Sequence, residues 1–321
     1  MSASAILQAA VLTSVLPVLL SAQGPAKPDS PAIRALIEKA RAMAGARWAE
    51  EARFFCEAPR GNSPDDPVIP PTKIFDNVSV IGNAGTVVYV VETSDGLVLF
   101  DSMTAGQLDT QLLPGFTALG LDPARVRAVI VAHGHQDHFG GSPYFQDRFG
   151  ARVYVSAADW DLLATPPQGR GGQPAPAPPR RDQVVVEGQP IVIGDFRVTP
   201  VAIPGHTAGS MGYIFPVRDG GRTRTAAMFG GTILNPAPIP DEGLRTYLAS
   251  IARFKDATRS ANVDVVLQNH PLMDPILPKL DLLRARKPGD AHPWVAGAAG
   301  YQTFLDVMAL CAEVNLARRR L

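Results

Sequence analysis

The chain has 321 residues with 30 basic and 30 acidic side chains, so its formal net charge is zero at pH 7. No excess of positive charge is present for nucleic acid or an acidic membrane surface, and we expect neither as a partner. Hydrophobic residues make up 46% of the chain, enough for a substantial core. Two cysteines exclude a disulfide scaffold and a four-cysteine zinc module. Any metal site must be built mainly from histidine, aspartate and glutamate.

The first residues have the features of a secretory signal. Residues 5–20 are almost entirely apolar, and Ser21-Ala22-Gln23 supplies small residues for cleavage. The stretch is short and contains Pro17, which disfavours a membrane span. A plain N-terminal helix is the alternative, because no Lys or Arg precedes the apolar run. We expect a signal peptide over residues 1–22, export to the periplasm or the exterior, and no membrane contact by the mature protein.

Residues 23–73 combine a helical pattern with a connector. Apolar residues recur at helical spacing over residues 31–43, and residues 59–71 are rich in Pro, Asp and Asn. In an oxidising compartment Cys56 and Cys311 would be able to pair, and two unpaired buried thiols are the alternative. The sequence leaves both open.

From residue 74 to residue 321 the pattern is that of one layered domain. Runs of β-branched residues at 78–81, 86–92 and 97–100 are separated by turn residues, which predicts a β-meander. We expect further strands at residues 126–131, 152–155, 184–186, 191–193, 198–203, 212–215, 225–229 and 263–267, and helices at residues 108–119, 142–149, 244–254, 280–286 and 301–319. Strands in both halves with helices between them predict an α/β fold with two sheets.

Residues 166–181 form a low-complexity insert of Pro, Gly, Ala and Arg. A surface loop is the simpler interpretation, and a lid over a substrate is the alternative. We favour the surface loop.

Four metal-capable side chains lie within the six residues His133-Gly134-His135-Gln136-Asp137-His138. The run follows an apolar strand and precedes Gly140-Gly141, and such a loop can direct alternate side chains into one cavity. Neutral imidazoles and carboxylates suit Zn²⁺. Because the whole chain has only six histidines, three of them in one hexapeptide argue strongly for a metal site.

Two further histidines follow predicted strands. His206 lies in Ile203–Thr207 and His270 in Leu267–Pro271. Taken singly, each would more often be a structural histidine, but together with the hexapeptide they form one set of histidines at strand ends. The sixth histidine, His292, lies in a Pro- and Gly-containing tail, and we interpret it as structural.

This pattern resembles the metallo-β-lactamase superfamily. The resemblance covers residues 74–275 and rests on the HxHxDH sequence, the two later histidines and the aspartate that ends a strand. It implies a four-layer αβ/βα sandwich with the metal site at one edge between two sheets. Matched position by position, the resemblance implies a first zinc site of His133, His135 and His206, a second of Asp137, His138 and His270, and a ligand-orienting carboxylate at Asp101.

One position separates the subfamilies. Glyoxalase II and lactonase types carry a bridging aspartate after the strand that follows the third histidine, but here Gly230-Gly231-Thr232 follows residues 225–229. Subclass B1 β-lactamases have a cysteine there and lack a second-site histidine after the aspartate, whereas this chain keeps His138. The resemblance is therefore closest to subclass B3. It implies that the Thr232 hydroxyl helps to bind the substrate, although the second hydroxyl position of that subclass is Leu234 here, whose side chain cannot form a hydrogen bond.

The function implied by the resemblance is hydrolysis of a small-molecule substrate with two zinc ions per chain. Water bound to zinc ionises near pH 7 and supplies hydroxide for attack on a carbonyl, with Asp137 orienting it or taking its proton. We expect opening of a β-lactam amide. The alternatives are a lactone, ester or other amide as substrate, and a metal-binding protein of this fold without hydrolytic activity.

Overall fold

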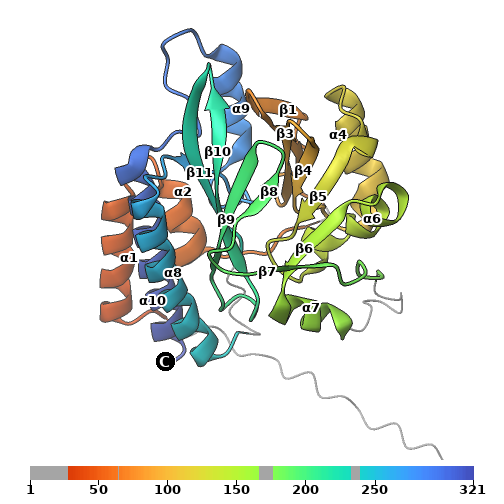
Figure 1. Ribbon diagram of the computed structural model, residues 1–321. Helices are drawn as coiled ribbons and strands as arrows, with labels where there is room; N and C mark the ends of the chain where they lie inside the picture. Colours follow the sequence, from red (N-terminus) through yellow and green to blue (C-terminus); the bar gives the residue numbers. More distant parts are fainter. Residues whose placement is uncertain (1–27, 64, 166–175, 233–238) are drawn as a thin grey trace, which may run out of the picture.

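The computed structural model describes residues 28–63, 65–165, 176–232 and 239–321. Within them two β-sheets pack face to face, and helices cover the outer side of each sheet (Figure 1). This arrangement confirms the predicted αβ/βα sandwich. Residues 1–22, residues 166–175 of the insert and Leu234 lie outside the described residues, so the expectations placed on them remain predictions.

The first sheet has seven strands in the order of the chain. They are β1 (Thr72–Phe75), β2 (Val78–Gly82), β3 (Val87–Thr93), β4 (Gly96–Phe100), β5 (Val126–Ile130), β6 (Arg152–Ser156) and β7 (Gln183–Val185). Neighbours from β1 to β4 are antiparallel, as the meander predicted, and neighbours from β4 to β7 are parallel. Parallel neighbours need crossover connections, and the helices that follow β4, β5 and β6 supply them. Strand β1 was not anticipated.

The second sheet has five strands. They are β8 (Ile191–Ile193), β9 (Phe196–Ala202), β10 (Met211–Asp219), β11 (Arg222–Phe229) and β12 (Val265–Val266), in the spatial order β12-β11-β10-β9-β8. The strand expected at residues 263–267 shortens to two residues, which pair in parallel with β11 at the edge of the sheet. The two sheets meet through aromatic side chains, and the ring of Phe100 stacks on that of Phe215 at 4.4 Å.

Helices form the two outer layers. The first sheet is covered by α4 (Leu113–Ala118), α6 (Ser142–Phe149) and α7 (Ala157–Ala164), and the second by α1 (Pro31–Ala44), α8 (Asp241–Ser260) and α10 (Gly297–Arg318), while α9 (Ile276–Ala285) lies near β1 (Figure 1). The helix expected at residues 108–119 is divided into a π-helical turn η2 (Leu108–Leu112) and α4, and a short helix α3 (Ala105–Gln107) precedes them. Pro114 lies at the start of α4, where its missing N–H interrupts regular helical bonding.

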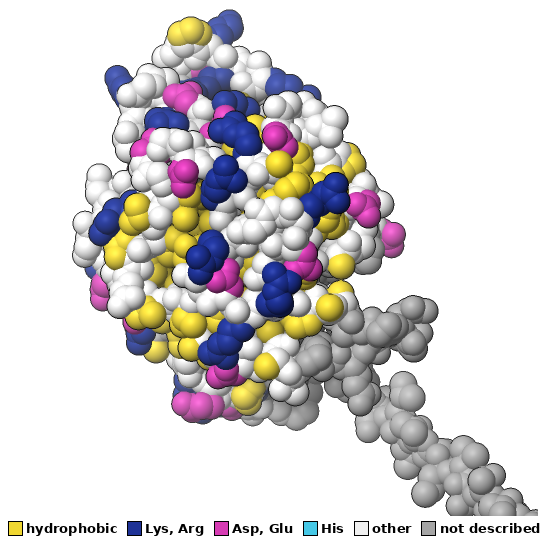
Figure 2. Space-filling view, turned by 45° about the vertical axis from the view of Figure 1, so that its right-hand side comes forward, with side chains coloured by type: hydrophobic (Ala, Val, Ile, Leu, Met, Phe, Trp, Pro, Cys, Tyr) yellow, Lys and Arg dark blue, Asp and Glu magenta, His cyan; other side chains and the backbone are white. Residues whose placement is uncertain are grey.

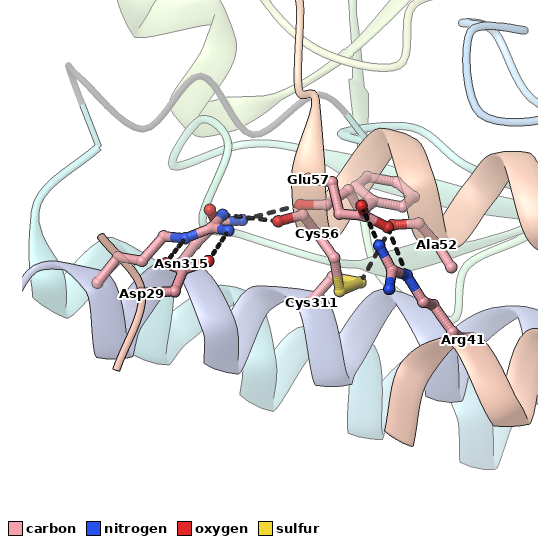
Figure 3. The surroundings of a disulfide bond; sticks show 9 residues. Asp29, Arg41, Ala52, Cys56, Glu57, Cys311 and Asn315 are labelled. Carbon is pink, nitrogen blue, oxygen red and sulfur yellow. Dashed lines mark hydrogen bonds and ion pairs between the residues drawn. A yellow bond between two sulfur atoms is a disulfide. The ribbon is translucent and has the colours of Figure 1, made fainter. Parts of the chain in front are cut away.

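The N-terminal segment packs into the same fold. Helix α1, the short α2 (Ala49–Ala52) and the π-helical turn η1 (Arg53–Glu57) share one apolar core with α8, α10 and the outer face of the second sheet. Cys56 in η1 is disulfide-bonded to Cys311 in α10, so the structure resolves the two alternatives in favour of pairing (Figure 3). Two segments 255 residues apart in sequence are thereby joined covalently.

The surface carries charges of both signs. On the face shown in Figure 2, Lys and Arg side chains are interspersed with Asp and Glu side chains and with small hydrophobic areas. No helix among the described residues combines the length and apolarity needed to cross a membrane. On the face shown, the mixed charges favour no single sign of ligand.

Candidate metal centre

Three loops that follow strands bring the predicted donors together. His133 lies just beyond β5, His206 beyond β9 and His270 beyond β12. The structure collects all six sequence-predicted side chains into two groups, His133, His135 and His206 in the first and Asp137, His138 and His270 in the second. Within each group the donor atoms lie within 4.8 Å of one another. The grouping is the one that the family resemblance implied.

The first group is three imidazole nitrogens that converge on one point. His206 Nε2 lies 3.0 Å from both His133 Nε2 and His135 Nδ1, and these last two atoms are 3.1 Å apart. Burial lowers the pKa of all three, that of His206 to about 3, so the rings are neutral at pH 7. Neutral nitrogens facing one another gain little unless they share a cation, and this is a zinc-type donor set.

The second group adds a carboxylate to two imidazoles. His138 Nε2 lies 3.0 Å from His270 Nε2 and 3.2 Å from Asp137 Oδ2, and His270 Nε2 lies 3.5 Å from the same oxygen. Burial lowers the pKa of His270 to about 4. Burial also acts to lower the pKa of His138, but the carboxylates of Asp137 and Asp101 outweigh it and raise the value to about 10. A divalent cation bound in this group would therefore replace a proton.

Three of the imidazoles are held from behind. Their Nδ1 atoms face acceptors: Gly230 O lies 2.8 Å from His133, Asp101 Oδ2 lies 2.7 Å from His138, and Gly85 O lies 2.7 Å from His270. A hydrogen on Nδ1 turns the lone pair of Nε2 inward, which is the tautomer a metal ligand needs. The side chains present fit a pair of metal ions.

Asp101 lies where the sequence placed it and orients His138. Strand β4 ends at Phe100, and Asp101 adopts φ 64°, an uncommon conformation for a residue other than glycine. Its Oδ1 accepts a hydrogen bond from Ala132 N at 2.7 Å, and its Oδ2 accepts one from Asn269 Nδ2 at 2.9 Å. The sequence analysis did not identify Asn269, although it directly precedes His270.

Asp159 is a buried residue that the sequence analysis missed. Its carboxylate accepts hydrogen bonds from Gly134 N at 2.7 Å, Thr207 Oγ1 at 2.8 Å and Gly209 N at 3.0 Å. It therefore ties the loop of His133 and His135 to the loop of His206. The only local signal is Ser156, which caps the start of α7 by accepting from Asp159 N, and that signal predicts a helix and says nothing of the metal loops.

The Gly230-Gly231 pair leaves no room for a bridging carboxylate without rearrangement. A Cβ atom at Gly230 would lie 2.1 Å from Met211 O, and one at Gly231 would lie 2.9 Å from the Cβ of His206. The first of these contacts is with rigid backbone, so any side chain at position 230 requires β10 to move. Close packing thus accounts for glycine at the position that the sequence analysis singled out.

The expectations for His292 and Thr232 have different outcomes. His292 is structural, because its Nε2 lies 2.8 Å from Ile74 O and its ring stacks on Phe75 at 4.0 Å. Thr232 is completely buried, and its carbonyl oxygen accepts a hydrogen bond from Tyr247 Oη at 3.3 Å. Contact between the Thr232 hydroxyl and a substrate would need movement of the chain there, and this role remains a prediction.

A four-layer sandwich with two adjacent groups of His and Asp donors at one edge is the architecture of the metallo-β-lactamase fold. Residues 81–220 match the family model described as the metallo-beta-lactamase superfamily. This range contains His133, His135, Asp137, His138 and His206. The motif-based recognition of the superfamily is confirmed, and this part of the chain belongs to it.

Solved structures show the same fold. A subclass B3 metallo-β-lactamase of Bradyrhizobium japonicum is 24% identical with a TM-score of 0.65, and the match covers 77% of this chain and 92% of that one. The native FEZ-1 metallo-β-lactamase from Legionella gormanii is 20% identical with a TM-score of 0.69, covering 80% of this chain and 99% of that one. At these identities the likeness establishes the architecture alone.

Relatives found by sequence include hydroxyacylglutathione hydrolases. That of Acidiphilium cryptum is 35% identical over 91 residues, 28% of this chain and 31% of the relative. That of a Jannaschia species is 26% identical over 170 residues, 47% of this chain and 60% of the relative. The chain thus spans less than two thirds of the length of these relatives. Together with the family model, they support a metal-dependent hydrolase.

Proposed function

We propose that the protein is an exported hydrolase that uses two zinc ions and opens a β-lactam amide. The observation that carries this proposal is the pairing of a three-histidine group with the group of Asp137, His138 and His270. The strand over residues 225–229 is followed by Gly230-Gly231-Thr232, which contains no carboxylate to bridge two metals. This combination is the one that relates the chain to subclass B3 within its superfamily.

The protein's own contribution to catalysis is orientation. Zinc ions, when bound, would polarise a carbonyl oxygen and lower the pKa of water toward neutrality. The acceptors behind His133, His138 and His270 hold these rings in place, so they need no reorganisation when a substrate arrives. The Asp137 side chain retains 18% exposure, and in this proposal its carboxylate orients the attacking water.

Export is supported by the disulfide. Bonds of this kind persist in oxidising compartments and are rare in the cytosol. Cys56–Cys311 therefore agrees with the apolar leader over residues 1–22 in favouring the periplasm or the exterior. N-terminal sequencing of protein from the native host should give a chain that begins near Gln23, and an intact Met1 or Ser2 would overturn export.

A second candidate function is hydrolysis of a thioester or another ester. The similarity to hydroxyacylglutathione hydrolases favours it. The absence of a carboxylate at Gly230-Gly231 counts against it, because the sequence analysis associates that bridging ligand with the thioesterase and lactonase types. The two candidates differ in substrate and share the same donor groups.

A single set of measurements on the purified protein tests both candidates. Zinc content is measured by mass spectrometry, and hydrolysis is assayed on penicillins, cephalosporins, carbapenems, lactones and hydroxyacyl thioesters, each with and without a chelator. We expect close to two zinc ions per chain and chelator-sensitive opening of at least one β-lactam class. Thioester turnover with no β-lactam turnover would select the second candidate. A metal-free, fully folded protein after purification with zinc would rule out both.

A further inference from the structure

One side chain outside the six donors reaches the second group. Asn62 lies in the connector, which we define as residues 58–63 and 65–70, between η1 and β1. Its Nδ2 donates to Asp137 Oδ2 at 2.9 Å and to Thr86 Oγ1 at 2.8 Å. Both amide hydrogens are therefore used. One bonds to Asp137, a donor of the second group, and the other bonds to Thr86, which contacts the donor His270.

Thr86 passes this contact on to His270. Thr86 Oγ1 lies 3.3 Å from His270 Nδ1, and the carbonyl of the preceding Gly85 lies 2.7 Å from the same nitrogen. Asn62 thus contacts Asp137 directly and is linked to His270 through Thr86. We propose that Asn62 is a positioning residue of the second metal site, and that the Cys56–Cys311 disulfide keeps it there. This inference rests on the metal site of the proposed function.

The physical reason is that Asp137 needs support from outside its own helix. Its helix α5 (Gln136–Phe139) is a single turn, and the side chain is partly exposed, so packing alone does not fix the rotamer of the carboxylate. Fixing a rotamer costs conformational entropy, which metal binding would otherwise have to overcome. A hydrogen bond from Asn62 restrains the carboxylate before the metal binds, which raises the affinity of the site.

The connector is packed tightly against the turn that it contacts. A Cβ atom at Gly85 would lie 2.1 Å from Asp66 Oδ2 and 3.0 Å from the Cβ of Asn62. Asp66 also pairs with Arg60 at 2.8 Å and accepts from Ser63 N at 2.7 Å, which folds the connector around Asn62. Glycine at position 85 is what permits this close approach.

Both ends of the connector are anchored. On the downstream side Ile69 N donates to Gly82 O at 3.0 Å, and Ala84 N donates to Pro67 O at 2.8 Å. On the upstream side the disulfide fixes Cys56 to α10, and Figure 3 shows the side chains gathered around it. Arg318 Nη1 also donates to Cys56 O at 2.6 Å. The exposed Asn62 itself has little packing, so its position depends on these anchors.

The test measures metal affinity rather than catalysis. Metal-free protein is titrated with Zn²⁺ against a chromophoric chelator, and with Co²⁺ while the visible spectrum is recorded, which separates the three-histidine group from the group containing Asp137. For Asn62→Ala we expect second-site affinity to fall roughly 10–100-fold, the range for partners that orient a ligand, with the first site unchanged. The matched control is Asp65→Ala, an exposed position of the same connector, which should bind both metals as the wild type does.

The disulfide is tested with Cys56→Ser/Cys311→Ser, since thiol reductants would themselves bind zinc. We expect a smaller loss at the second site, and no further loss when Asn62→Ala is already present, because both changes act through one contact.

Unchanged affinities in Asn62→Ala, or equal losses at both sites, would overturn the positioning role. Equal losses from the cysteine changes with and without Asn62 would overturn the tether. If the cysteine variant does not fold, Asn62→Ala still decides the first point. If the wild type itself binds fewer than two metals, the proposed function fails.

Discussion

The two donor groups are supported by different parts of the molecule. The first is held by groups from the interior of the sandwich, the carbonyl of Gly230 and the buried carboxylate of Asp159. The second shares interior support from Asp101, but it also depends on the exposed Asn62 of the N-terminal connector. The difference teaches that one donor group is supported by the central fold, whereas the other is also supported by the N-terminal connector, which the disulfide joins to α10.

Removing a donor from each group should have the largest effect and tests most directly whether the two groups act separately. His206→Ala takes one of three imidazoles from the first group, and His270→Ala takes one of three donors from the second. Each should lower kcat/KM by more than the roughly 100-fold upper range of orienting partners, because the metal itself is lost. We expect a one-zinc protein from His270→Ala, with residual activity partly restored by excess zinc. Parallel measurement of metal content and rate checks this, and full activity of His270→Ala with one zinc would show the second metal to be dispensable.

Breaking the disulfide should have the next largest effect, and on stability. The bond closes a loop of most of the chain, and removing a native disulfide typically costs about 2–5 kcal/mol. The Cys56→Ser/Cys311→Ser variant should therefore unfold at distinctly lower denaturant concentration than the wild type. Denaturant titration at fixed zinc concentration measures the change. A midpoint equal to that of the wild type would mean that α10 and the N-terminal helices hold together by packing alone.

Asp101 and Asp159 test the difference between the two donor groups further, because each carboxylate supports one group. Asp101→Ala should weaken the second site and Asp159→Asn the first, each by roughly 10–100-fold in metal affinity. In the second case an amide nitrogen would face donors that now point at a carboxylate oxygen. Competition titration of both variants separates the sites. The same site weakened in both would show that the two supports are not independent.

The smallest expected effect concerns Glu51, which lies on the inner side of the N-terminal segment. It is fully buried, and neither carboxylate oxygen has a hydrogen-bond partner among the described residues. Burial, with a smaller contribution from Asp274, raises the pKa of Glu51 well above its usual range. At low pH the carboxyl is protonated in both folded and unfolded chains, and as pH rises only the unfolded chain releases the proton freely, which lowers stability.

Glu51→Gln removes that titration. The stability advantage of the variant should be absent near pH 4 and should grow with pH, by about 1.4 kcal/mol for each unit by which folding raises the pKa of Glu51. Thermal unfolding at several pH values provides the check. A constant difference across pH would indicate that the pKa of Glu51 is the same in the folded and unfolded chains.

The sequence predicted the parts of the site that are encoded locally. The hexapeptide from His133 to His138 is contiguous, and His206 and His270 each follow a recognisable strand, so the packing of the two sheets brings the three strand ends together. Asp159 and Asn62 were out of reach, because their roles arise from contacts between segments distant in sequence. For the same reason the pairing of Cys56 with Cys311 was left open until α10 was seen to pack beside η1.

The fold was predicted where periodicity was strong and was inaccurate where tertiary context intervened. The meander and most later strands lie where the β-branched runs placed them, but β1 follows a proline-rich stretch that hid its four residues. At the edge of the second sheet β12 shortens to Val265–Val266, since it pairs as a strand with β11 and forms a single bridge, Val265 to Val295, on its other side. Such endpoints are set by neighbours in space rather than by local pattern.

The close approach of Met211 O to Gly230 also bears on how this protein could evolve. A Cβ atom at position 230 would lie 2.1 Å from that oxygen, so an acid gained there would require β10 to shift. Such a shift is expected to destabilise the variant. Introducing a side chain at position 230 in the laboratory should therefore require compensating changes in β10 first.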